Sequence, residues 1–191
     1  MSIAANAVIS LADTKVYVKE IGTTNDAILT ILINAVSTVF DKYVDVVQII
    51  EAAYTNAYHD GNGLSVIKLP YINLSAITAL TENDITLTEG YDDDYVKIQS
   101  LGYLKKISGV WARGNQNIKI SCTAGYKLAN VPGDLQLACM KQVAFEFQQY
   151  VQKNWGESSR SFGDGSTSMF REITLLEDVK EILNRYRAVQ I

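Results

Sequence analysis

The chain has 191 residues, of which 48% are hydrophobic and 20% are charged, a composition typical of a globular protein that buries a core of its own. Its 17 Lys and Arg against 21 Asp and Glu residues give a formal net charge of −4, which argues against tight, non-specific binding to a nucleic-acid backbone. No apolar run reaches the ~18–20 residues of a membrane span, and the start of the chain lacks the basic residues of a signal peptide. We therefore expect a cytoplasmic protein without a membrane partner.

Two cysteines, Cys122 and Cys139, lie far apart and form no C-x-x-C pair. In a reducing compartment, such residues are typical of small side chains in a core. We expect them to be reduced and to bind no metal.

The first part of the chain predicts two helices. Ser10 and Asp13 are spaced as a capping box, which starts a short helix that ends at Gly22. Thr23 and Asp26 repeat the same start signal. A second, longer helix is expected to follow.

Apolar residues of the second helix recur at helical spacing from Ile28 to Tyr43. Ile31 and Ile33 widen the apolar stripe beyond one face. A helix that is apolar on most sides needs two partners. We expect one of them to be another protein subunit, with Ile28, Ile31 and Ile33 as candidate interface residues.

After about Glu51 the pattern changes to short β-prone runs separated by turns. Asp60-Gly61-Asn62-Gly63 is a strong turn signal, and it predicts that a strand at Tyr54–His59 is followed by a returning strand at Leu64–Leu69. Further strands are predicted at Ala76–Leu80, Ile85–Thr88, Tyr95–Gln99, Tyr103–Ile107 and Asn117–Thr123. Their regular spacing is typical of an antiparallel sheet.

The last part of the chain is again helical. Pro132 and Asp134 are typical helix-start residues, and the helix that they start is predicted to run to about Trp155. Gly156–Ser168 is rich in Gly and Ser and is predicted to be a mobile loop. A short final helix is predicted from about Leu175 to Tyr186.

Catalytic and metal-binding patterns are absent from the sequence. The single histidine, His59, lies beside the predicted turn and is expected to be an exposed strand end. Asp92, Asp93 and Asp94 could hold Ca²⁺ or Mg²⁺, but consecutive side chains point in different directions, which favours a solvated turn. Neither G-x-G-x-x-G nor a P-loop occurs. We predict that the chain is not an enzyme and needs no cofactor or metal.

Two further features are candidates for contact with other molecules. The 11 tyrosines could form a stacking platform for single-stranded nucleic acid, but no basic groove accompanies them, so core and interface roles are expected. Arg185, Tyr186 and Arg187 lie at the end of the last predicted helix. They either complement its dipole or form a docking site.

The order of features along the chain resembles the head–tail connector (neck adaptor) family of tailed bacteriophages and gene-transfer particles. The resemblance is carried by four stretches, which cover most of the chain in the expected order: the two helices from Leu11 to Tyr43; Tyr58–Gly63 with Leu69-Pro70 and Ser75–Thr78; Thr123–Tyr126 with Val131–Leu135; and Leu175–Val179 through Arg187. A strand-rich stretch follows soon after Asp45, so the chain is similar to the longer, β-containing subtype.

This resemblance implies a structural role. Subunits of such families form a ring, commonly of twelve copies, beneath the portal protein, and the ring extends the DNA channel and docks the next stopper or tail-completion protein. An acidic balance suits a channel through which DNA passes without sticking. The expected location is the neck of the virion, after assembly in the host cytoplasm, and the expected portal or subunit contacts are the three isoleucines and Arg185, Tyr186 and Arg187.

The fold expected from these observations is α+β, a helical bundle with an inserted antiparallel β unit. Residues 1–46 and 124–191 would form the helical adaptor core, and residues 47–123 the inserted antiparallel β domain. The alternatives are another virion tail-completion protein, a metal-dependent hydrolase at Asp92–Asp94, and a nucleic-acid-binding module that uses the tyrosines.

Overall fold

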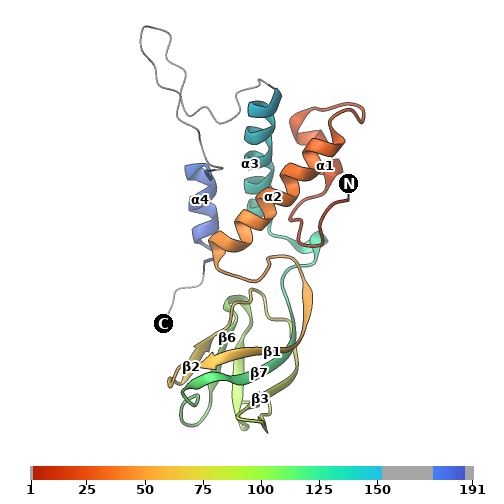
Figure 1. Cartoon of the computed structure of the whole chain (residues 1–191). Coiled ribbons are helices and arrows are strands. Elements are labelled where there is room, and N and C mark those ends of the chain that lie inside the picture. The colour runs from red at the N-terminus through yellow and green to blue at the C-terminus, as the bar shows by residue number, and fades with distance from the viewer. Residues whose placement is uncertain (1, 152–173, 188–191) are drawn as a thin grey trace. The chain divides into compact units, whose positions relative to one another are not determined.

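The computed structural model describes residues 2–151 and 174–187. Within these residues the chain forms α-helices and two antiparallel sheets, which confirms the predicted α+β class (Figure 1). The helices are α1 (Leu11–Val18), α2 (Asp26–Val44), α3 (Gly133–Val151) and α4 (Glu177–Asn184). The strands are β1 (Ala52–Gly61), β2 (Val66–Lys68), β3 (Ala76–Glu82), β4 (Ile85–Thr86), β5 (Tyr95–Ile98), β6 (Tyr103–Lys106) and β7 (Gly114–Ala124). Short 3₁₀ turns occupy Gln99–Leu101 and Leu128–Asn130.

The chain divides into two compact units, and the first boundary falls inside α2. Of the described residues, 2–37, 132–151 and 174–184 make up the first, which we call the helical unit, and 38–131 and 185–187 make up the second, the β unit. That residues 47–123 form an inserted domain of their own remains a prediction.

The helical unit is built around α3, which packs against both α1 and α4. The helix cap predicted at Ser10 is present: the Ser10 hydroxyl oxygen accepts a hydrogen bond from the Asp13 backbone N–H at 3.1 Å and donates to the Asp13 carboxylate at 2.5 Å. On α3 the buried face is formed by Leu135, Ala138, Cys139, Gln142, Val143 and Phe147. The segment before α1 is tied to α2, because the Ala4 and Val8 N–H groups donate to the side chains of Asn34 and Ser37.

Helix α2 has an apolar face that is buried within the chain, with Leu29, Ile33 and Val36 at most 1% exposed. By length and composition alone this helix could also cross a membrane, a property that the sequence analysis did not identify. A core helix passes the same test, and the burial of these side chains accounts for its apolar character.

The β unit contains a four-stranded sheet of order β1-β7-β3-β4 and a three-stranded sheet of order β2-β6-β5. All strand pairs are antiparallel. Asn83 and Asp84 both have positive φ, as a two-residue turn between β3 and β4 requires. The two sheets share one apolar core, whose fully buried members include Leu69, Leu74, Leu80, Leu104, Trp111, Ile118 and Ile120.

The hairpin predicted around Asp60–Gly63 is wrong, although a turn is present there. β1 pairs with β7, and β2 pairs with β6, so the two segments belong to different sheets. Asn62 satisfies the turn locally, because its side chain accepts from the Leu64 N–H and donates to the Val66 carbonyl oxygen, both at 2.9 Å. The turn was therefore predicted correctly, whereas the strand that pairs with β1 was not.

Candidate functional site

Helix α4, which directly precedes the C-terminal candidate residues, packs on α3. Leu175, Val179 and Leu183 are at most 6% exposed and lie at four-residue steps, which places them on one side of the segment. This helix is too short to be stable alone. Its packing on the chain's own α3 supplies the partner that it requires.

Gln142 fixes the segment that leads into α4. Its side chain is fully buried on α3, and its Oε1 accepts from the Leu176 N–H at 3.0 Å. Its Nε2 donates to the carboxylate of Glu146 at 2.8 Å and to the Thr174 carbonyl oxygen at 3.4 Å. The amide thus supplies partners to backbone groups just before the helix begins.

An exposed ion pair adds a second connection between α3 and α4. Lys141 Nζ lies 2.8 Å from Asp178 Oδ2. This hydrogen bond raises the pKa of Lys141 and lowers the pKa of Asp178 from their ordinary values. Because both groups face solvent, the pair orients α4 more than it stabilises the fold.

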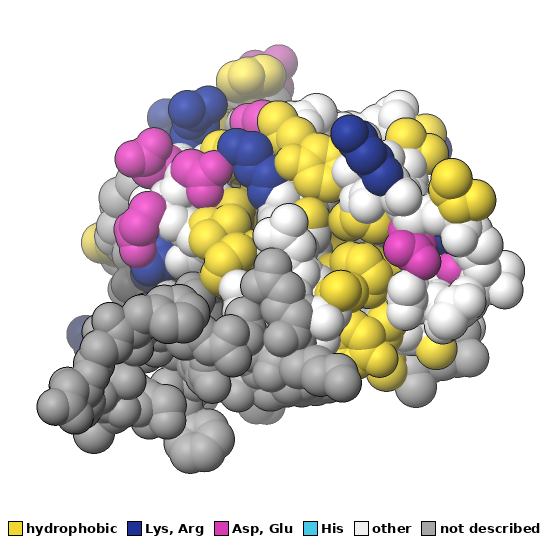
Figure 2. Space-filling view, turned by 90° about the horizontal axis from the view of Figure 1, so that it is seen from above, with side chains coloured by type: hydrophobic (Ala, Val, Ile, Leu, Met, Phe, Trp, Pro, Cys, Tyr) yellow, Lys and Arg dark blue, Asp and Glu magenta, His cyan; other side chains and the backbone are white. Residues whose placement is uncertain are grey.

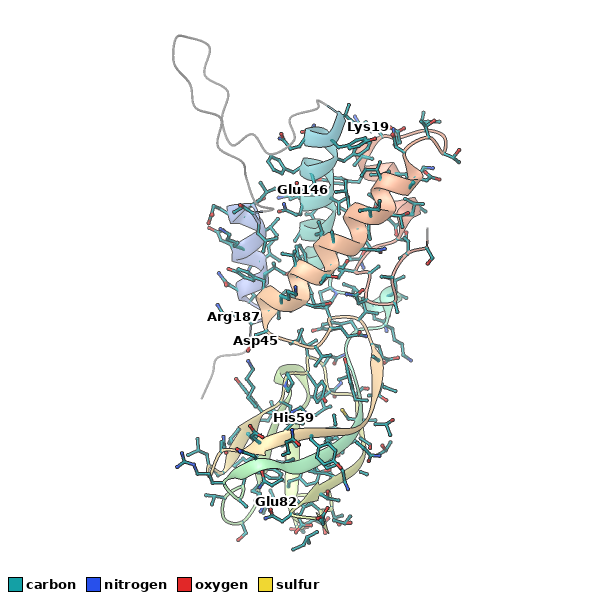
Figure 3. The ribbon with its side chains drawn as sticks, viewed as in Figure 1. Lys19, Asp45, His59, Glu82, Glu146 and Arg187 are labelled. Atoms are coloured by element: carbon teal, nitrogen blue, oxygen red, sulfur yellow. The ribbon has the colours of Figure 1, made fainter. Side chains whose placement is uncertain are left out.

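The three C-terminal candidates directly follow α4. Arg185 and Arg187 are exposed, and Tyr186 is half-buried; Figure 3 labels Arg187 in this position. Two guanidinium groups at the end of a helix are available to carboxylates of another protein. Whether they bind a portal remains a prediction.

The three isoleucines of α2 lie in different environments. Ile31 is 42% exposed, Ile28 is half-buried, and Ile33 is fully buried. Ile33 therefore packs inside the core of its own chain, and the candidate contact on α2 narrows to Ile28 and Ile31.

The helical unit also carries an apolar groove between α1 and α3, which we call the α1–α3 groove. It has a volume of about 640 Å³ and is lined mainly by Tyr17, Val18, Phe145, Gln148, Val151 and Leu176. Lys19, Glu20 and Lys141 add polar groups to its lining; Figure 3 labels Lys19 at the end of α1, beside the end of α3. A groove of this size is large enough to accept several side chains of another chain.

The surface around this part of the helical unit has no single charge sign. Figure 2 shows hydrophobic side chains interleaved with Lys or Arg and with Asp or Glu. Such a mixture is typical of protein–protein contacts and differs from the uniformly basic surface of a nucleic-acid-binding protein.

The polar candidates of the β unit have structural partners. His59 is half-buried, which corrects the expectation of an exposed strand end, and its Nε2 lies 3.1 Å from the Tyr71 hydroxyl. Packing against that ring buries the imidazole, and burial lowers the pKa of His59. Asp92, Asp93 and Asp94 are exposed, and Asp94 accepts from the Thr88 N–H in the predicted turn. Among the described residues no three His, Cys, Asp or Glu side chains gather closely enough to hold a metal ion.

An ion pair between the buried Glu82 and the half-buried Lys106 of the β unit also has a structural role. The Glu82 carboxylate binds Lys106 Nζ and accepts from the Ala112 N–H at 2.6 Å, and the Lys106 ammonium lies 5.3 Å from the centre of the Trp111 ring. These contacts fix the loop after β6. Figure 3 labels Glu82 at the end of β3.

Sequence reasoning missed Gln142 and the groove. The spacing of Leu135, Ala138 and Cys139 on α3 places position 142 on the same buried side, so helical periodicity held the signal for Gln142. The groove had no such signal, because it depends on the distance between two helices that are far apart in sequence.

Comparisons with known proteins identify a family and a fold. A family model described as head completion protein matches residues 7–189, and no curated protein matches. Similar chains occur in three solved structures: the neck of an empty GTA particle computed with C6 symmetry (TM-score 0.57, 16% identity), the virion of a native gene transfer agent (GTA) particle (0.55, 16%) and the neck of a native GTA particle computed with C12 symmetry (0.54, 15%). Each alignment covers 100% of this chain and 94% of the other.

Proposed function

The chain belongs to the head completion protein family, a family of structural proteins, and we propose that it is a subunit of the neck between the head and the tail of a tailed phage or gene-transfer particle. The observation that carries this proposal is the family match, because it spans residues 7–189 and not one short motif. Similarity of fold to chains from GTA necks supports it over the whole length of the chain.

In this proposal the subunits form a ring of twelve copies beneath the portal protein, and the ring extends the DNA channel. One of the similar structures is a neck computed with C12 symmetry and another is a neck computed with C6 symmetry, both of which are compatible with such a ring. Ile28 and Ile31 on α2 are proposed to contribute to contacts in the assembly. The net charge of −4 favours passage of DNA without binding.

Arg185, Tyr186 and Arg187 are proposed to dock on the portal protein, with carboxylates as the partners of the two arginines. Support comes from their exposure and from the way that Gln142 and Lys141 hold α4. The ring then offers a platform to a stopper or tail-completion protein. The protein would act in the virion neck without catalysis or a cofactor, after assembly in the host cytoplasm.

Complementation of particle production tests the portal contact. A particle producer that lacks the gene is supplied with R185A/R187A, and portal co-purification is measured. We expect a loss of at least tenfold with little change in the melting temperature of the protein. The matched control is K105A/R113A, which removes two exposed cations of the β unit and should bind portal normally. Equal binding by both variants would refute the docking site, and recovery of the wild-type protein only from tails would favour a tail-completion protein.

A further inference from the structure

The three-stranded sheet of the β unit has one face in the core and one face outside it. Ile67, Leu104 and Tyr95, one from each strand, belong to the shared core and are at most 3% exposed. Because side chains alternate along a strand, the neighbouring positions point away from the core. The registers of β2, β6 and β5 place these outward positions side by side in two rows, Val66 with Lys105 and Val96, and Lys68 with Tyr103 and Ile98.

Most outward positions of this sheet are aliphatic, where a solvated antiparallel sheet usually carries polar side chains. Val66 and Val96 are half-buried, and Ile98 is 40% exposed. Ile107 is also 40% exposed and continues the alternation past the end of β6, because its N–H donates to the Asp94 carbonyl oxygen in the same register. We call the surface made by these four aliphatic residues and Lys105 the β6 outer face.

The four-stranded sheet of the same unit shows the usual arrangement. Its strand β7 alternates between buried residues of the core and half-buried polar residues outside it, namely Lys119, Ser121 and Thr123. On the neighbouring β3, Thr81 pairs with Lys119. The aliphatic surface is therefore particular to the three-stranded sheet, and contact with another molecule would account for it.

Of the charged residues at outward positions of this sheet, two already have partners. Lys68 Nζ lies 2.9 Å from a carboxylate oxygen of Asp45, and the Asp94 carboxylate accepts from the Thr88 N–H at 2.8 Å. Lys105 is exposed and has neither an ion pair nor a hydrogen bond within the part of the chain that the structure describes. An ammonium group between two valines needs a carboxylate partner once the surface around it is covered.

We propose that the β6 outer face binds a neck protein other than the portal, through an apolar surface of that protein that carries a carboxylate opposite Lys105. The choice of a neck protein rests on the proposed function, and the portal is set apart because its contact is assigned to the residues after α4. Two copies that faced each other through this surface would bring their Lys105 ammonium groups together in an apolar contact, which like charges oppose. The complementary charge is therefore assigned to a different protein.

Carbodiimide cross-linking of purified particles tests the contact, because this reagent joins a lysine amine to a carboxylate that touches it. Peptide mass spectrometry should find Lys105 joined to an Asp or Glu of a neck protein that is neither the portal nor this chain. Lys119, on the outer side of the other sheet, should join no other protein. K105R keeps the charge without the amine, so it should remove the cross-link and leave the neck complete. Cross-linking of Lys105 to the portal, to another copy or to no protein would overturn the proposal.

A charge reversal provides an independent readout. K105E should reduce recovery of the cross-linked partner in particles at least tenfold while this chain stays in the neck, because it turns the complementary charge into a like one. The matched control is K119E, the same substitution on the outer side of β7, which should retain the partner. Both variants should melt close to the wild-type temperature. Full retention of the partner by K105E would overturn the contact, whereas absence of the wild-type chain from necks would overturn the proposed function itself.

Discussion

Replacement of Gln142 by leucine tests the way in which α4 is held. The change removes a fully buried amide and leaves the Leu176 N–H, which donates to it at 3.0 Å, without that partner. Loss of one buried hydrogen-bond partner costs about 1–3 kcal/mol. The apolar leucine offsets up to about 1 kcal/mol of this loss. We expect a net loss of about 1–2 kcal/mol in the free energy of unfolding.

Thermal melting and hydrogen exchange of the full-length protein measure this effect. For a cooperative unit of this size each kcal/mol lowers the melting temperature by about 4–8 °C, and the amides of Glu177–Asn184 should lose protection before those of α3. The matched control is Gln148→Leu, the same substitution at an exposed position of the same helix. If Q142L melts and exchanges like Q148L, the amide does not hold α4 and the account of this segment is wrong.

Three further predictions concern the β unit and the pH dependence of α4. Gly102→Ala should destabilise the protein by about 2–4 kcal/mol in denaturant unfolding, because Gly102 has φ +68 and an added Cβ would lie 2.0 Å from a backbone carbonyl oxygen; Gly133→Ala, where an added Cβ meets nothing within 4 Å, should be nearly neutral. Replacing Asp92, Asp93 and Asp94 together by Asn should leave folding and particle assembly intact, and loss of a bound ion with loss of assembly would contradict this. The hydrogen bond from Lys141 is the main cause of the lowered pKa of Asp178. The stabilisation that Asp178 contributes is therefore complete above the ordinary pKa of 3.8 and is lost as the pH falls through the lowered pKa. D178N should flatten the acid side of a plot of melting temperature against pH, and an unchanged plot would refute the pairing of Asp178 with Lys141.

Local signals allowed much of the fold to be predicted. The helix cap at Ser10 depends on residues three positions apart, and the structure contains it. Each predicted strand from Ala76 to Thr123 has a counterpart at nearly the same residues, because alternation and turn residues are properties of short segments. The α+β class follows from these segments. The predicted loop at Gly156–Ser168 and the predicted helix end at Trp155 lie outside the described residues.

Features that depend on distant residues could not be predicted in this way. β1 pairs with β7, and the register joins Tyr54 to Cys122, a partner that no local turn specifies. Gln142 and Glu82 are polar residues whose burial depends on specific partners that lie elsewhere in the chain: the Leu176 N–H for Gln142, and Lys106 and the Ala112 N–H for Glu82. Likewise Ile33 and Ile31 are alike in sequence, and only the packing of α2 separates the buried from the exposed one.

Electron cryo-microscopy of purified particles whose copy of this chain carries a small visible tag tests the central claim most directly. We expect tag density in the neck, between the portal and the next neck protein, repeated around a ring of twelve copies. Tag density confined to the tail, or necks that are complete in structure but lack the tagged chain, would contradict it.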